Sequence, residues 1–114
     1  MPYLSVTTTK AIGGWHAKEF LHAASKLVAE RLEKPESVVM TAIQQPQVMS
    51  LGGNDAPCAM IELSILAIDD SRIHDLYGAL HAMAVQHLGL PGDRIFINFH
   101  DIPRGRWGCN GQVF

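Results

Sequence analysis

The sequence has little of several features that would place it in a specialised class of protein. It contains only two cysteines, Cys58 and Cys109, which form no Cys-x-x-Cys pair, so a disulfide scaffold is excluded and a reduced, cytoplasmic chain is expected. It has no run of lysine or arginine and a formal net charge of −2, which argues against a nucleic-acid partner. No apolar stretch approaches the roughly 20 residues of a membrane helix, and the first residues resemble no secretory signal.

The chain does have enough apolar material for a packed core. Hydrophobic residues make up 47% of its 114 residues and charged residues only 18%, which is the balance of a folded protein rather than a disordered one. Chains of roughly 100–150 residues usually make one domain. We therefore expect residues 1–114 to form a single domain.

Periodicity and turn residues predict six main elements in the order βαββαβ. Apolar residues three and four positions apart predict helices over 15–33 and 71–88. Runs rich in β-branched and aromatic residues predict four strands, over 3–9, 37–43, 58–67 and 94–99. Asp69, Asp70 and Ser71 offer capping side chains for the second helix.

This order contains a hidden repeat. A Leu-x-x-Pro pattern stands before a strand twice, at Leu32–Pro35 and at Leu88–Pro91, so residues 1–56 and 57–114 form two similar βαβ halves. Each half should pair its two strands in parallel. The expected fold is therefore an α+β sandwich: a four-stranded mixed sheet with both helices on one face.

The strands offer apolar residues in both alternations, so the second face of the sheet also needs a cover. Ile61 and Leu63 alternate with Met60, and Ile95 and Ile97 alternate with Phe96. A sheet that is apolar on both faces in so small a chain predicts that a neighbouring subunit covers the free face.

Two residues could carry chemistry, and each has a plainer interpretation. Excision of Met1 would leave Pro2 as an amino-terminal secondary amine, which an apolar surround or a nearby cation can keep neutral and basic. Pro2 could equally be a residue that merely precedes a strand. Lys34, at the end of the first helix, could bind a substrate carboxylate, or it could simply complement the helix dipole.

The other polar residues give weaker signals. The six histidines lack the spacing of a metal site, so solvated or hydrogen-bonded histidines are expected and no metal is. His100 and Asp101 are neighbours in a strand, so their side chains point to opposite faces. Asn98 stands within an apolar strand, where its amide needs a hydrogen-bond partner or a ligand.

Together these features resemble the macrophage migration inhibitory factor family of the tautomerase superfamily. The similarity extends over essentially the whole chain. The matching blocks are Met1-Pro2, LEKPE around Lys34, MSLGGNDAPCA, Ser64-Ile65, PGDRIFINFHD and WGCNG. The resemblance implies a homotrimer with active sites between subunits and a cofactor-independent keto–enol tautomerase that acts on small aromatic 2-oxo acids of the phenylpyruvate type.

The resemblance also implies a role for each matching residue. Pro2 is expected to be the base, Lys34 to hold the substrate carboxylate, and the backbone amide of Ile65 (or of Leu66) to assist there. Asn98 of a neighbouring subunit is expected to contact the distal end of the substrate. The aromatic wall of the pocket is expected to comprise Tyr3, Phe96, Trp107 and Phe114.

This chain departs from the family pattern at three positions. Phe96 replaces a tyrosine, so a phenol donor is missing and the substrate preference can differ. Ile61 replaces the second cysteine of a family Cys-x-x-Cys pair, which leaves no support for a thiol-oxidoreductase activity. Cys109 replaces a pocket tryptophan, although Trp107 lies two residues earlier.

Three alternatives remain open at this point. The chain could be a cytokine-like trimer that binds a protein receptor, leaves the cell by non-classical secretion and keeps only a vestigial site. It could be a tautomerase of the D-dopachrome type. It could also use its proline for dehalogenation or decarboxylation, reactions for which relatives place arginines near the proline.

Overall fold

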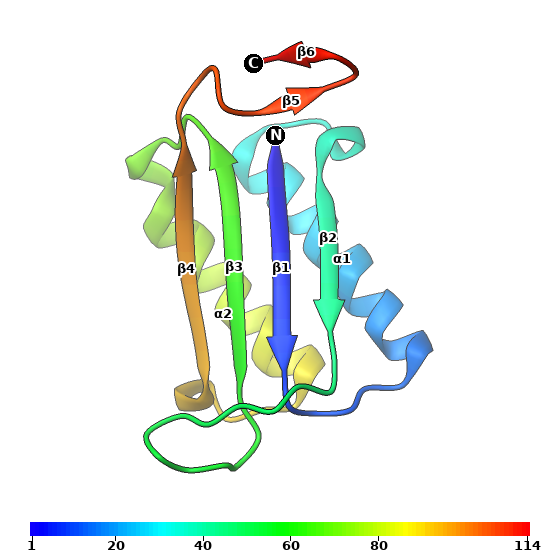
Figure 1. Cartoon of the computed structure of the whole chain (residues 1–114). Helices are drawn as coiled ribbons and strands as arrows, with labels where there is room; N and C mark the ends of the chain where they lie inside the picture. The colour runs from blue at the N-terminus through cyan, green and yellow to red at the C-terminus, as the bar shows by residue number, and fades with distance from the viewer.

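The computed structural model describes residues 1–114 and has the expected βαββαβ order, followed by a small hairpin. Four strands form one sheet in the order β2-β1-β3-β4, and both helices pack on the same face of it (Figure 1). The elements are β1 (Pro2–Thr8), α1 (Gly14–Leu32), β2 (Met40–Gln44), β3 (Ala59–Leu66), α2 (Ile73–Leu88), β4 (Ile95–Ile102), β5 (Gly108–Cys109) and β6 (Gln112–Val113).

The sheet is mixed because each half pairs its own strands in parallel and the halves meet in antiparallel fashion. β1 runs parallel to β2, and β3 runs parallel to β4, each pair being connected across a helix. β1 and β3 lie antiparallel at the centre of the sheet, where Pro2 pairs with Ile65 and Thr8 with Ala59. The predicted four-stranded mixed sheet with two helices on one face is confirmed.

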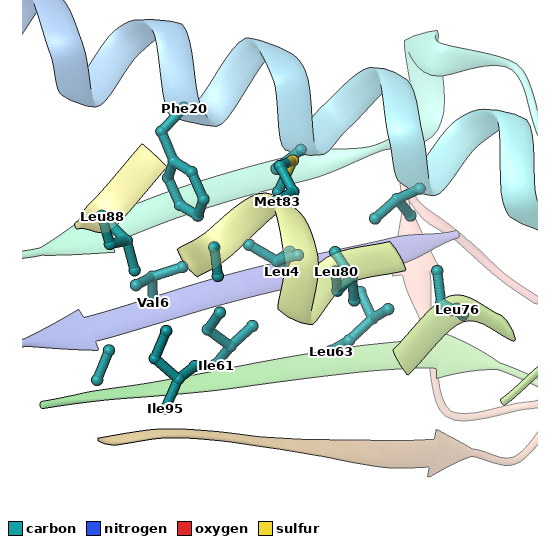
Figure 2. Packing of buried hydrophobic residues seen from close by; sticks show 14 of the residues in the cluster. Leu4, Val6, Phe20, Ile61, Leu63, Leu76, Leu80, Met83, Leu88 and Ile95 are labelled. Carbon is teal, nitrogen blue, oxygen red and sulfur yellow. The ribbon is translucent and has the colours of Figure 1, made fainter. Parts of the chain in front are cut away.

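The hydrophobic core fills the layer between the helices and the sheet. Every second residue of β1 and β3 is buried there, and Figure 2 shows their side chains meeting those of both helices. The most completely buried large side chains of this layer are Leu4, Val6, Phe20, Val28, Ile61, Leu63, Leu76, Leu80 and Leu88. Burying a side chain of this size contributes about 1.5–3 kcal/mol, so these residues dominate the stability of the fold.

The other face of the sheet is open and polar in its middle. Ser5, Glu62 and Asn98 lie level with one another across β1, β3 and β4. Large apolar side chains remain exposed only toward the ends of this face, at Met40 and Phe96. The expectation of a second apolar face is therefore wrong for its centre, because polar residues occupy the alternate positions of the strands there.

Both helices end in the same kind of turn. The residue after α1, Glu33, and the residue after α2, Gly89, adopt the left-handed conformation (φ 55° and 66°), and each is followed two residues later by a proline. A short 3₁₀ turn then precedes the strand, over Glu36–Val38 and Gly92–Arg94. The predicted strand over 37–43 therefore begins only at Met40, since residues 36–38 complete the turn.

The second helix also begins later than predicted. Asp69 accepts a hydrogen bond from the backbone amide of Ser71 at 3.0 Å, but the turn that it caps is a 3₁₀ turn over Asp70–Arg72. The α-helical bonding starts after it, at Ile73. Neither α1 nor α2 is both long and apolar enough to span a lipid bilayer.

Both chain ends lie at one end of the sheet (Figure 1). The β5–β6 hairpin passes over the start of β1, while the long loop between β2 and β3 lies at the opposite end. The last residue is fixed to the hairpin, because the Phe114 amide donates to the carbonyl oxygen of Trp107 at 2.7 Å. This arrangement brings the C-terminal segment next to Pro2.

Candidate functional site

Pro2 occupies a sheltered position at the end of the central strand. It begins β1, its side chain is fully buried, and it pairs with Ile65 of β3. Strand alternation turns Pro2 toward the same side as Leu4 and Val6. Pro2, the candidate base, is therefore fixed by its place in the sheet and is not part of a flexible terminal segment.

A cavity of about 550 Å³ opens beside Pro2. Its walls come from the start of β1, the turn before β2 and the β5 segment, and most of its lining residues are hydrophobic. They are Met1, Pro2, Tyr3, Ser37, Val38, Val39, Met40, Ser64, Ile102, Arg106, Trp107, Gly108 and Cys109. Arg106 is the only charged side chain among them. A space of this size and character suits a small, largely apolar molecule.

A second, smaller cavity of about 250 Å³ lies on the other side of Met1 and is mainly polar. Its charged lining residues are Glu33, Lys34, Asp69, Arg72 and Arg104, and Ile65 and Leu66 also line it. The two carboxylates are already occupied, because Arg72 contacts Glu33 at 2.9 Å and Asp69 at 3.6 Å. Lys34 and Arg104 make no ion pair, so this cavity offers free positive charge to an anion.

The surroundings of the amino terminus favour a neutral amine. Partial burial, and then the positive charge of Lys34, lower the pKa of the Met1 amine below its usual value. Both effects disfavour the protonated form. The Met1 amine is therefore more often neutral near neutral pH than an ordinary α-amino group.

Met1 also engages a backbone N–H group of β3 in a hydrogen bond. Its carbonyl oxygen accepts a hydrogen bond from the amide of Leu66 at 3.3 Å. Removal of Met1 would free this N–H group on the side of the smaller cavity, which Leu66 also lines. The sequence left open whether the amide of Ile65 or that of Leu66 assists substrate binding. In the structure it is the Leu66 amide that loses its hydrogen-bond acceptor when Met1 is removed.

The structure brings together only some of the residues proposed from the sequence. Pro2, Tyr3 and Trp107 line the larger cavity, and Lys34 and Ile65 line the smaller one.

Three proposed residues lie outside both cavities. Phe96 is 56% exposed near the start of β4, and Asn98 lies on the open face of the sheet. Phe114 is bonded to the backbone of Trp107 but does not line either cavity. Within one chain, Asn98 and Phe96 therefore cannot reach a molecule bound beside Pro2.

Sequence reasoning could not place the arginines and assigned one wall of the site to the wrong element. Arg104 and Arg106 were visible as residues, but nothing in their spacing indicates that they line two different cavities. Val38 and Val39 were assigned to a strand, whereas the turn after Pro35 places them against the larger cavity. The recurring proline was the signal that could have identified this turn.

The open face holds one further polar group of residues. Tyr3, Ser5 and Glu62 line a shallow cavity of about 300 Å³, together with His100, whose Nε2 lies 3.5 Å from the Glu62 carboxylate. Nowhere do three or more histidine, cysteine, aspartate or glutamate side chains gather in a way that could hold a metal ion.

The model of the family described as "Macrophage migration inhibitory factor (MIF)" matches residues 1–114, the whole chain. The protein belongs to the MIF family. A MIF homologue of Trichuris trichiura is 36% identical over 99 residues, which are 84% of this chain and 85% of the homologue.

Solved structures agree with this assignment. The crystal structure of a MIF homologue from Prochlorococcus marinus superposes with a TM-score of 0.90 at 34% identity and covers 98% of both chains. Pt0534, solved after inactivation by 2-oxo-3-pentynoate, has a TM-score of 0.86 at 18% identity, over 97% of this chain and 94% of its own. The fold is that of the MIF family and the tautomerase superfamily.

Proposed function

We propose that the protein is a cofactor-independent keto–enol tautomerase of aromatic 2-oxo acids, in which the amine of Pro2 acts as the base after removal of Met1. The observation that carries this proposal is the position of Pro2, which is buried at the end of β1 beside an apolar cavity and follows Met1, a residue that also lines a cavity with free positive charge. An arylpyruvate is complementary to these two cavities, because it combines an apolar ring with an anionic 2-oxo acid group.

The reaction needs only the movement of a proton. The neutral amine of Pro2 removes a proton from the carbon next to the ketone, and the electron pair of that C–H bond moves to form the enolate. Water donates a proton to the enolate oxygen, which gives the enol, and the protonated amine of Pro2 passes its proton to water, which restores the base. In the reverse direction the protonated amine returns its proton to carbon. No atom is gained or lost, so no oxidant, reductant or other co-reactant is required.

Two groups are suited to hold the carboxylate of the substrate. The ammonium of Lys34 has no acidic partner and stands close enough to the chain end to lower the pKa of its amine. The Leu66 amide loses its acceptor when Met1 departs, and Ile65 provides the adjoining backbone. A charge-assisted contact with Lys34 and a backbone N–H bond would fix the 2-oxo acid beside Pro2.

The ring of the substrate would lie in the larger cavity, against Tyr3 and Trp107. Aromatic side chains form favourable offset or edge-to-face contacts with a bound ring. Phe96 supplies no phenol, so we expect recognition of the ring to depend on apolar contact more than on a hydrogen bond from residue 96. D-Dopachrome remains an alternative substrate of the same site.

We further propose that the active unit is a homotrimer. In one chain Asn98 and the exposed Phe96 lie too far along the sheet to contribute to the cavity beside Pro2. A neighbouring copy that covers the open face could supply Asn98 to the distal end of the substrate and bury Phe96. Light scattering should give a mass close to three times 12.5 kDa; a monomer at micromolar concentration would refute the shared site.

The test of the activity is ketonisation of phenylpyruvate by protein whose loss of Met1 is verified by intact mass. We expect measurable turnover, a fall of at least about 100-fold in Pro2→Gly, and covalent labelling of Pro2 by 2-oxo-3-pentynoate. Circular dichroism and light scattering should show that Pro2→Gly keeps the fold and assembly. Negligible turnover by Met-free wild type would refute the phenylpyruvate assignment and favour a protein-binding trimer with a vestigial site.

A further inference from the structure

The two cavities at the amino terminus have a single lining residue in common. Met1 lines both of them, and no other residue does. Its excision would therefore join the larger cavity to the smaller one, with the nitrogen of Pro2 at the junction. A substrate that reaches Lys34 on one side of Pro2 can then extend along the larger cavity toward Trp107 on the other side.

Positive charge stands on both sides of this junction. Lys34 and Arg104 line the smaller cavity without ion-pair partners, and Arg106 is the sole charged side chain of the larger one. The whole chain has a net charge of −2, so this local excess of positive charge is not a general property of the protein. It creates a potential that attracts anions to both parts of the joined cavity.

The backbone fixes the position of Arg106. Its amide donates to the carbonyl oxygen of Pro103 at 3.2 Å, and the neighbouring Gly105 amide bonds to the carbonyl oxygen of Phe114. The next residue, Trp107, is bonded in turn to the Phe114 amide. Arg106 thus stands on a turn held from both sides, beside the aromatic wall, rather than on a free tail.

A substrate with a single carboxylate would use only one of these charged regions. Its 2-oxo acid group would occupy Lys34 and the Leu66 amide, and its ring would fill apolar space next to Arg106 without giving that guanidinium a partner. An anionic group on the far side of the ring would provide one. Guanidinium and carboxylate groups form two parallel hydrogen bonds, which makes such a contact both strong and selective.

We propose that Arg106 is a specificity-determining residue that selects aromatic 2-oxo acids with a second carboxylate on the ring, an inference that rests on the proposed tautomerase function. Lys34 holds the 2-oxo acid end, Pro2 moves the proton, and Arg106 binds the ring carboxylate in the larger cavity. Arg104 lies on the side of the 2-oxo acid and does not discriminate between rings.

The test compares two substrates of nearly equal shape, 4-carboxyphenylpyruvate and the neutral 4-carbamoylphenylpyruvate. We expect Met-free wild type to prefer the carboxylate by about tenfold in kcat/KM, the effect of one charge-assisted contact. Arg106→Gln should remove this preference. Arg104→Gln should change kcat/KM for both substrates by the same factor. Arg31→Gln, which alters an exposed partner of Asp75 outside both cavities, should keep the wild-type ratio.

The outcomes separate this inference from the proposed function. If wild type turns over both substrates with equal kcat/KM, or if Arg106→Gln keeps the preference, the role of Arg106 is refuted while the tautomerase activity stands. If wild type turns over neither substrate, the proposed function fails, and calorimetric binding of the same two compounds decides the role of Arg106. Tighter binding of the carboxylate that Arg106→Gln abolishes supports the role, and equal affinities refute it.

Discussion

Met1 and Leu66 are joined by a hydrogen bond at the end of the central sheet, with the Leu66 amide donating to the Met1 carbonyl oxygen at 3.3 Å. The next residue, Pro2, pairs with Ile65. While Met1 is present, the nitrogen of Pro2 is part of a tertiary amide and the Leu66 amide is occupied. A single proteolytic event would therefore supply both the base and a backbone donor for the substrate.

Retention of a residue before Pro2 should abolish activity. We expect protein that begins at Met1 to ketonise phenylpyruvate at least about 100-fold more slowly than protein that begins at Pro2, because an amide nitrogen is not a base. The two forms are separated by mass and assayed in parallel. Pro2→Ala, which like Pro2→Gly offers only a primary amine after Met1 removal, should lose activity by a factor similar to that of Pro2→Gly and still turn over faster than the blocked form. Equal rates for blocked and free protein would exclude the amine as the base.

Loss of the positive charge of Lys34 should change both binding and pH dependence. A nearby cation destabilises the protonated amine, so Lys34→Gln should raise the pKa of the amine and move the acid limb of kcat/KM to higher pH. Burial also lowers this pKa, so the shift should be partial. KM for phenylpyruvate should rise about tenfold with the loss of a charged contact.

The control for this measurement is Lys18→Gln, which removes the same charge from an exposed position on α1. Its pH profile and KM should match those of wild type. An acid limb in Lys34→Gln that coincides with the wild-type limb would show that Lys34 does not act on the base.

The two cysteines should differ sharply in reactivity. Cys109 is exposed and lines the larger cavity, whereas Cys58 is buried, with 2% of its surface accessible. N-ethylmaleimide should therefore add once per chain, at Cys109, and block phenylpyruvate turnover by filling the cavity. Cys109→Ser should resist the reagent. Two adducts in the folded protein, or a fully active adduct at Cys109, would contradict the position of this side chain.

The conformation of the loop between β2 and β3 should be stabilised by Arg94. This guanidinium donates hydrogen bonds to the carbonyl oxygens of Leu51, Asn54, Ala56 and Pro57, at 2.7–3.4 Å. We expect Arg94→Ala to lower the free energy of unfolding by about 1–3 kcal/mol, since several carbonyl groups lose a charged donor.

Unfolding in urea at a fixed protein concentration would measure this loss, because any assembly makes stability depend on concentration. Arg31→Ala is the comparison: it breaks an exposed ion pair with Asp75 and should cost no more than about 1 kcal/mol. Equal free energies of unfolding for Arg94→Ala and Arg31→Ala would show that water replaces the hydrogen bonds of Arg94 without loss of stability.

The fold could be predicted from the sequence because its signals are local. The four-residue spacing of Phe20, Ala24 and Val28 indicates one helical face, and all three are buried in the core. The start of β2 was misplaced by three residues, because Val38 and Val39 have the composition of a strand but lie in and after a turn that follows Pro35.

The site could be predicted only in part, for a different reason. Pro2 begins a regular strand, so its place in the sheet follows from the topology, whereas the distance between Lys34 and Pro2 could not be inferred from the sequence. Arg104 and Arg106 lie on an irregular segment, and neither periodicity nor spacing indicates which cavity such a residue will line. The open face was misjudged because Met60 and Phe96 are apolar, whereas Glu62 and Asn98, two residues further along the same strands, are polar.

The convergence of both chain ends on one side of the sheet restricts how the protein can be labelled (Figure 1). A purification tag or fluorescent protein fused before Pro2 would cap its nitrogen. One fused after Phe114 would sit beside the wall that Trp107 contributes. The loop between β2 and β3 lies at the far end of the molecule, and Val48 is fully exposed there. A short epitope inserted at Val48 should therefore allow the protein to be detected while its tautomerase activity is measured in the same sample.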